Sequence, residues 1–183
     1  MTALLLIDIQ LGLDRLDYYG GERNNPQAET NAGLLLNFCR KNGIAVYHVQ
    51  HSSKNPDSPL HPSKPGFAIK QEVRPLAGEP HYIKNENSAF VGTSLEQDLK
   101  ENGITQLVIC GLATEHCVST STRMAANLGF DVILIEDGTA AFAKQDKEIS
   151  YPAQLVHDIE LACLKHEFAT ILSARQWLAN QEN

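Results

Sequence analysis

The sequence predicts an α/β fold, with a parallel β-sheet covered by helices on both faces. Apolar runs typical of strands alternate with segments of helical periodicity along most of the chain. The first run, residues 3–7, is continuously apolar, as in a strand buried on both faces. Strand, helix and strand follow one another within about fifty residues, which is typical of a right-handed βαβ unit. We therefore expect a Rossmann-like, three-layer α/β/α arrangement.

Apolar patterns and end signals place the individual elements. Six strands are expected, at residues 3–7, 44–49, 79–84, 106–111, 131–136 and 168–172. Five helices are expected: residues 28–42, from a capping box at 93–96 to Gly103, between Cys117 and Gly129, 152–165, and after a cap at 173–176. The expected inward positions are Ala28, Ala32, Leu35, Leu36 and Cys39 in the first helix and Val156, Ile159 and Cys163 in the fourth. Asp137 is expected to cap or brace the segment after the fifth strand.

The composition is that of an ordinary globular protein, and we expect residues 1–183 to form a single domain. The formal net charge of −7 argues against a nucleic-acid partner. No signal peptide and no membrane-spanning run is expected. The four cysteines form no C-x-x-C pair, which favours a reduced, cytoplasmic protein over a disulfide framework.

Three side chains with catalytic chemistry lie next to predicted strand ends. Asp8 follows the first strand, Lys84 ends the third, and Cys117 lies between the fourth strand and the next helix. Because the carboxyl ends of parallel strands share one edge of the sheet, the three residues can meet there. A thiol attacks a carbonyl as thiolate; an ammonium and a helix start lower its pKa, and a carboxylate can carry its proton.

Each of the three residues also has an ordinary structural role. Asp8 suits a turn, Lys84 suits a solvated surface position, and Cys117 suits a small buried apolar position. Their common place at the strand ends favours a cysteine nucleophile.

A long loop after the second strand contains further polar residues. His48, His51 and His61, with Asp57 nearby, suggest a metal site, but their spacing matches no tight metal motif. We therefore expect no metal and solvated loop histidines. The proline-rich segment 52–78 has the length of a lid, a binding loop or a subunit contact, and we expect it to close the pocket.

Three motifs in this order carry a resemblance to a known family. They are LLLIDIQ at 4–10, K-x-x-x-SAF at 84–90 and GLATEHCV at 111–118. Together they resemble the isochorismatase-like cysteine hydrolases, which include nicotinamidases and N-carbamoylsarcosine amidases. The resemblance covers nearly the whole chain, through VILIEDGTAAF at 132–142 to the last helix.

The resemblance implies a six-stranded parallel sheet of order 3-2-1-4-5-6. It places Asp8, Lys84 and Cys117 at the positions of the family's catalytic triad. It further implies a cis peptide bond between Leu112 and Ala113, with the N–H groups of Ala113 and Cys117 forming an oxyanion hole. A small-molecule substrate and a homo-oligomer are expected, and no cofactor.

Gln10, Phe90 and His116 are candidates for the lining of the substrate pocket. Each has an alternative: Gln10 bonded to the backbone, Phe90 in the core, and His116 in solvent. In nicotinamidases an Asp-x-His motif and a further histidine after the second strand bind a metal. Here that place holds HVQHSS, residues 48–53, so neither nicotinamide as substrate nor a metal is expected.

The residues and the resemblance together predict a hydrolase of a small amide or ureido C–N bond, acting through a thioester on Cys117. Three alternatives remain open. They are an isochorismatase-type or other non-amide hydrolase, a redox-sensing thiol protein, and a non-catalytic oligomeric scaffold.

Overall fold

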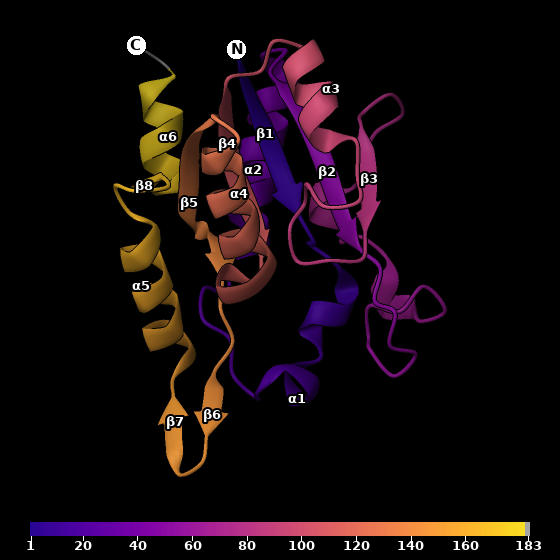
Figure 1. Ribbon diagram of the computed structural model, residues 1–183, viewed down its shortest axis with the longest axis vertical. Coiled ribbons are helices and arrows are strands. Elements are labelled where there is room, and N and C mark those ends of the chain that lie inside the picture. The colour runs from indigo at the N-terminus through magenta and orange to yellow at the C-terminus, as the bar shows by residue number, and fades with distance from the viewer. Residues whose placement is uncertain (182–183) are drawn as a thin grey trace.

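The computed structural model describes residues 1–181, which fold around a six-stranded parallel sheet (Figure 1). Its strands are β1 (Thr2–Ile7), β2 (Ala45–His51), β3 (His81–Lys84), β4 (Gln106–Leu112), β5 (Asp131–Ala140) and β8 (Thr170–Leu172). They lie in the order β3-β2-β1-β4-β5-β8, and every neighbouring pair is parallel. Counted within this sheet the order is 3-2-1-4-5-6, so the predicted fold class and strand order are confirmed.

Helices cover both faces of the sheet. Those of eight or more residues are α2 (Ala28–Lys41), α4 (Ser119–Asn127) and α5 (Ala153–Leu164), and shorter ones include α3 (Leu95–Glu101) and α6 (Ala174–Asn180). Buried residues of α3, α4 and α5 share one core cluster, and those of α2 and α6 share another. Figure 1 shows α3 and α4 in front of the sheet and α2 behind it. The arrangement is the expected three-layer one.

Strand β1 explains why both faces need a cover. Leu5 and Ile7 belong to the core cluster beneath α3 and α4, whereas Leu4 and Leu6 belong to the cluster beneath α2. Successive side chains of a strand point to opposite faces, so a continuously apolar strand buries both.

A smaller layer closes the carboxyl edge of the sheet. It contains the short helices η1 (Leu11–Asp14), α1 (Leu16–Tyr19) and η2 (Pro65–Phe67), and an antiparallel hairpin of β6 (Lys144–Asp146) and β7 (Ile149–Tyr151). The short helix η3 (Gln71–Val73) instead contributes Val73 to the core cluster beneath α2. The hairpin projects beyond the body of the molecule (Figure 1). This hairpin was not predicted, because its residues are mostly polar and its strands have three residues each.

Two helix ends differ in how well the sequence predicted them. The box at 93–96 does not form: Ser94 is the N-cap of α3 without a side-chain cap, and the Thr93 hydroxyl donates to the Ala89 carbonyl instead. The cap at 173–176 is confirmed as a capping box between Ser173 and Gln176. Asp137 accepts a hydrogen bond from the backbone N–H of Ala174, at the start of α6, so it braces a later helix than expected.

The predicted inward face is confirmed for α2 and wrong for α5. In α5 the buried residues are Ala153, His157, Leu161 and Leu164. Ile159 is 53% exposed and Cys163 is also exposed. The helix is apolar on several sides, so its periodicity did not distinguish the face that packs on the sheet. No helix within residues 1–181 is long and apolar enough to cross a membrane.

Candidate active site

Three neighbouring strands bring an acid, an imidazole and an ammonium to one place. Lys84 and His51 are paired at the carboxyl ends of β3 and β2. Asp8 follows β1 directly, and its backbone N–H donates to the Val49 carbonyl of β2 at 2.9 Å. Asp8 has a φ of 52°, a left-handed conformation that Asp tolerates better than most residues. The chain therefore turns sharply at the acid as it leaves the sheet.

The Lys84 ammonium lies at the centre of this group and is fully buried. It donates to Asp8 Oδ2 at 2.7 Å and to the Cys117 sulfur at 3.2 Å. It also lies 3.0 Å from the Glu86 carbonyl oxygen and 3.2 Å from His51 Nδ1. Lys84 thus contacts both of the other predicted triad residues, Asp8 and Cys117.

Cys117 lies in a single π-helical turn, η4 (Thr114–Val118), between β4 and α4. The Ala113 carbonyl accepts hydrogen bonds from the N–H groups of His116 and Val118, which fixes the shape of this turn. The Leu112–Ala113 peptide bond before it is cis. The helix was expected to begin right after Cys117, whereas α4 begins at Ser119, two residues after the thiol.

The surroundings of the Cys117 sulfur favour the thiol over the thiolate. Burial raises the pKa of Cys117 well above its ordinary value, the Asp8 charge raises it further, and the Lys84 ammonium only partly opposes the two. The sequence predicted a lowered pKa because it counted the cation and the helix start but not the burial. Asp8 Oδ1 is buried and has no hydrogen-bond partner among residues 1–181. This carboxylate oxygen is therefore free to accept a proton from the thiol.

Cys117 opens into a cavity of about 370 Å³. One wall is apolar and aromatic: Tyr19 stacks on Phe142 with ring centroids 5.0 Å apart, next to the buried Leu13 and Leu60. The complete lining is Asp8, Leu13, Tyr18, Tyr19, His51, Ser58, Leu60, Asn87, Leu112, Ala113, His116, Cys117 and Phe142. Ser58 and Leu60 come from the proline-rich loop, so this loop forms part of the cavity wall.

The lining carries little net charge. Burial lowers the pKa of both His51 and His116 and outweighs the neighbouring carboxylates, which raise it, so the neutral form of each ring is favoured. Burial raises the pKa of Tyr19 to about 12. The Asp8 carboxylate is paired with Lys84. The cavity therefore offers hydrogen-bonding groups and apolar surface, but no unpaired charge.

Of the three expected pocket residues, only His116 lines this cavity. Gln10 is fully buried behind it, where its side chain bonds the backbone of His51 and the Phe67 carbonyl. Its amide thus ties the first strand to the long loop. Phe90 packs against the core and stacks on Phe130 at 6.2 Å. Both correspond to the structural alternatives rather than to a pocket role.

Several lining residues were missed by reasoning from the sequence. His51 ends β2, which runs two residues beyond the strand predicted at 44–49, so its place at a strand end was not predicted. Asn87 lies inside the K-x-x-x-SAF motif, and its Oδ1 is 3.8 Å from the Cys117 sulfur. Tyr19 and Phe142 gave no signal, because their places depend on how α1 folds over the sheet edge.

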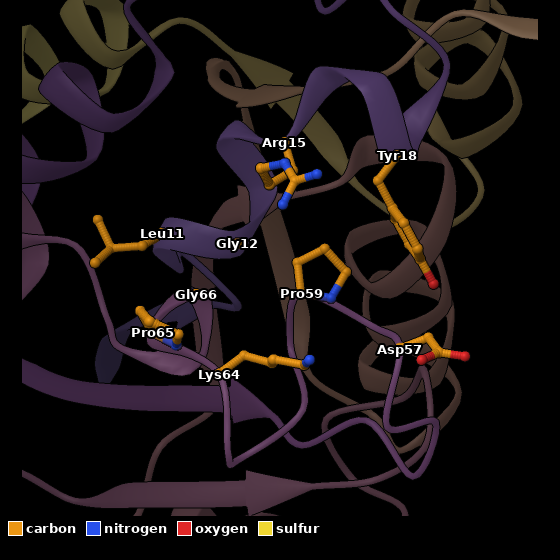
Figure 2. A pocket seen from close by; sticks show the side chains of 9 residues that line it. All are labelled: Leu11, Gly12, Arg15, Tyr18, Asp57, Pro59, Lys64, Pro65 and Gly66. Carbon is orange, nitrogen blue, oxygen red and sulfur yellow. The ribbon is translucent and has the colours of Figure 1, made fainter.

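A second cavity of about 400 Å³ shares Tyr18 with the first. Residues of the same two segments, 11–18 and 57–66, contribute to the lining of both cavities. Figure 2 shows Arg15 and Lys64 on opposite sides of Pro59, with Asp57 near the Tyr18 hydroxyl. Its charged side chains distinguish this outer cavity from the nearly uncharged inner one.

The candidate metal ligands do not converge as a set. His48 bonds Glu79 at 2.8 Å and His61 bonds Ser63 at 2.8 Å, both away from the cavity. Donor atoms of Asp8, His51 and Cys117 do lie within 4.8 Å of one another. The Lys84 ammonium already contacts these three residues, so a metal cation there would face a fixed positive charge.

Fold and site together define an α/β protein with a buried cysteine centre at the carboxyl edge of its sheet. The family described as the isochorismatase domain matches residues 2–176. The isochorismatase family protein YrdC of Bacillus subtilis is 49% identical over 175 residues, 95% of this chain and 92% of its own length. A crystal structure of an isochorismatase-family protein from Chromobacterium violaceum is 41% identical, with a TM-score of 0.94 over 100% of this chain and 94% of that one.

The chain therefore belongs to the isochorismatase family, the family its motifs resemble. It is also similar to streptothricin hydrolase of Streptomyces noursei, 31% identical over 78% of this chain and 50% of that protein.

Proposed function

We propose that the protein hydrolyses a C–N bond of a small amide or ureido compound, with Cys117 as nucleophile. The observation that carries the proposal is the contact of one buried ammonium with both the Asp8 carboxylate and the Cys117 sulfur. The free Asp8 Oδ1 beside a protonated thiol supplies the general base that this chemistry needs.

In the first half-reaction Asp8 accepts the thiol proton while the sulfur bonds the substrate carbonyl carbon. The carbonyl electron pair moves to oxygen, and the N–H groups of Ala113 and Cys117 stabilise that oxyanion. The oxyanion then collapses, the C–N bond breaks, and Asp8 gives its proton to the departing nitrogen. A buried, paired carboxylate suits this role, because Lys84 holds it in place through both proton transfers.

In the second half-reaction water hydrolyses the thioester. Asp8, again unprotonated, takes a proton from the water, and the acid product leaves as the sulfur regains a proton. The expected contribution of each oxyanion donor is about 10²–10³ in rate.

The lining of the inner cavity supports an uncharged substrate with an apolar part. The reacting carbonyl lies at Cys117, and the apolar part packs on Tyr19, Leu13 and Leu60. A carboxylate close to the scissile bond would be desolvated without a free cation to pair with, which is costly. The similarity to streptothricin hydrolase supports a small-molecule substrate in general terms.

The proposal is tested by measuring ammonia release from a panel of primary amides and ureas. The panel contains matched pairs, such as an arylalkyl amide and an amide of the same length ending in a carboxylate. We expect turnover of at least one uncharged member and rates at least tenfold lower for its anionic partner.

Cys117→Ala removes the nucleophile and should abolish release, whereas Cys163→Ala, at an exposed position on α5, should leave it unchanged. Acid-quenched mass spectrometry should detect an acyl group on Cys117. Failure of every amide and urea by a folded protein would reject the proposal. Ready oxidation of Cys117 by peroxide without any turnover would favour the redox-sensing alternative.

A further inference from the structure

The Lys84 ammonium has more acceptors than protons. Four acceptor atoms lie within 3.2 Å of its Nζ: Asp8 Oδ2, the Glu86 carbonyl, His51 Nδ1 and the Cys117 sulfur. An ammonium donates three hydrogen bonds. Asp8 Oδ2 and the Glu86 oxygen are the two nearest, at 2.7 and 3.0 Å. His51 and Cys117, both at 3.2 Å, therefore compete for the third proton.

We propose that His51 is a positioning residue that accepts the third Lys84 proton whenever the Cys117 sulfur is uncharged. The role of His51 during the reaction rests on the proposed function. The competition itself is a property of the resting site.

The burial of the ammonium makes this second acceptor necessary. The Lys84 side chain has no exposed surface, so an N–H without a partner cannot turn to bulk water. An unsatisfied buried donor of a charged group is costly. A thiol or thioester sulfur is a weak acceptor, whereas a thiolate is a strong one. His51 Nδ1 accepts in the tautomer that carries its proton on Nε2.

The third proton then alternates through the cycle. With a thiol, it lies on His51 Nδ1. When Asp8 takes the thiol proton, the new thiolate attracts the Lys84 N–H. Once the sulfur has bonded the acyl carbon, its charge is lost and the N–H returns to His51. Lys84 thereby stays fully paired while the charge of the sulfur changes.

Other titratable groups also face the sulfur. They are Asp8 after β1, Lys84 of β3, Tyr19 of α1 and His116 of its own turn, and His157 of α5 contacts the same turn through Thr114. The Glu86 backbone lies beside both His51 and Lys84. Apart from the sulfur itself, His51 is the neutral side chain that contacts the ammonium among residues 1–181.

The test is the alkylation of Cys117 by iodoacetamide, measured in a Cys163→Ser background from pH 7 to 9. In His51→Leu the ammonium has no acceptor for its third proton except the sulfur. The thiolate, which is the stronger acceptor, is therefore stabilised relative to the thiol. Below the thiol pKa the rate follows the thiolate fraction. We expect alkylation about tenfold faster than in the parent, equivalent to a thiol pKa lower by about one pH unit.

Two variants separate this effect from a change in access to the cavity. His51→Asn offers an amide oxygen near the place of Nδ1 and should restore the parent rate. His61→Leu, in the loop that follows His51, should have no effect, because within residues 1–181 the His61 side chain hydrogen-bonds only Ser63. If the leucine variant does not fold, His51→Phe provides a ring without an acceptor, and the same acceleration is expected.

Equal or slower alkylation in folded His51→Leu or His51→Phe would overturn the proposal, as would equal acceleration in His51→Asn. These outcomes are independent of amide turnover. Acceleration in a protein that hydrolyses no amide would support the role of His51 and reject only the proposed function.

Discussion

Asp8 and Lys84 form an ion pair with 2.7 Å between Oδ2 and Nζ, and neither side chain is more than 2% exposed. A buried pair of this kind costs a great deal to break, because the remaining charge has no partner and no solvent. It owes its geometry to the sheet, since β1 and β3 flank β2 on either side. Two of the three candidate catalytic residues are thus also part of the folded core.

The first prediction separates these two roles. Lys84→Met should lower the free energy of unfolding by about 3–5 kcal/mol by leaving the Asp8 carboxylate unpaired. The double variant Asp8→Asn with Lys84→Met should recover most of that loss while remaining inactive. Chemical denaturation at pH 7 measures the stabilities, and ammonia release measures the activity. Strict additivity of the two single-variant losses would contradict a coupled pair.

The second prediction concerns the thiol. Because burial and the Asp8 charge raise the pKa of Cys117, alkylation in the Cys163→Ser background should still rise about tenfold per pH unit at pH 9. A free model thiol should level off near its ordinary pKa of about 8.5. Cys39 and Cys110 are completely buried and should not contribute. A plateau below pH 8 for Cys117 would show instead that Lys84 dominates its environment.

Much of the fold could be predicted from the sequence, because the strongest patterns belong to the sheet. A strand such as Leu4–Ile7, apolar at every position, has few alternatives to a central place. Helix α5 shows the limit of this reasoning. Its buried face includes His157, whose Nδ1 lies 3.0 Å from the Thr114 hydroxyl, while the apolar Ile159 faces outward. Periodicity does not predict such a polar contact between a helix and a distant turn.

The site was predictable where it depends on strand ends and not where it depends on loops. Asp8 and Lys84 follow from the sheet alone, since strand order brings them together. The lining residues Tyr19 and Phe142 meet only after α1 and the end of β5 have folded over the edge. The sequence does not show how deeply Cys117 is buried. The direction of its pKa shift was therefore predicted wrongly.

The third prediction tests the aromatic wall. Tyr19→Ala removes a ring that stacks on Phe142 and lines the cavity, so a substrate with an apolar part should lose contact area there. We expect KM to rise about tenfold, equivalent to about 1.4 kcal/mol of binding, with kcat changed much less. Initial rates against substrate concentration give both constants. Tyr151→Ala, on the projecting hairpin, serves as control; a fall in kcat alone would contradict the assignment.

The fourth prediction concerns stability in acid. Although burial opposes ionisation, hydrogen bonds from Arg40, the Leu76 N–H and His48 lower the pKa of Glu79 to about 2. A lowered pKa stabilises the fold above the unfolded value of 4.5, and this contribution is lost as the pH falls towards about 2. Glu79→Gln should therefore lower stability by about 2–3 kcal/mol at pH 7.

The difference between parent and Glu79→Gln should shrink steadily below pH 4.5 in urea denaturation curves. As a control, Glu86→Gln removes a carboxylate that is 55% exposed and pairs with Lys54. Because an exposed ion pair contributes little, this variant should have nearly the parent stability across the same pH range. A loss for Glu79→Gln that does not vary with pH would indicate packing rather than charge.

The fifth prediction concerns Gly111, which pairs with Ile7 directly before Asp8. Its φ of 152° and the Ile7 carbonyl oxygen, which a Cβ would strike, both exclude a side chain. Gly111→Ala must therefore push β4 away from β1 and move Asp8 relative to Cys117.

Gly43→Ala is the matched control: φ is 67° there, but no atom lies within 4 Å of the added carbon. We expect about 1 kcal/mol of lost stability for the control and several times that for Gly111→Ala, measured by thermal unfolding. Equal losses would mean that conformation alone, and not the close approach of the two strands, requires glycine at this position.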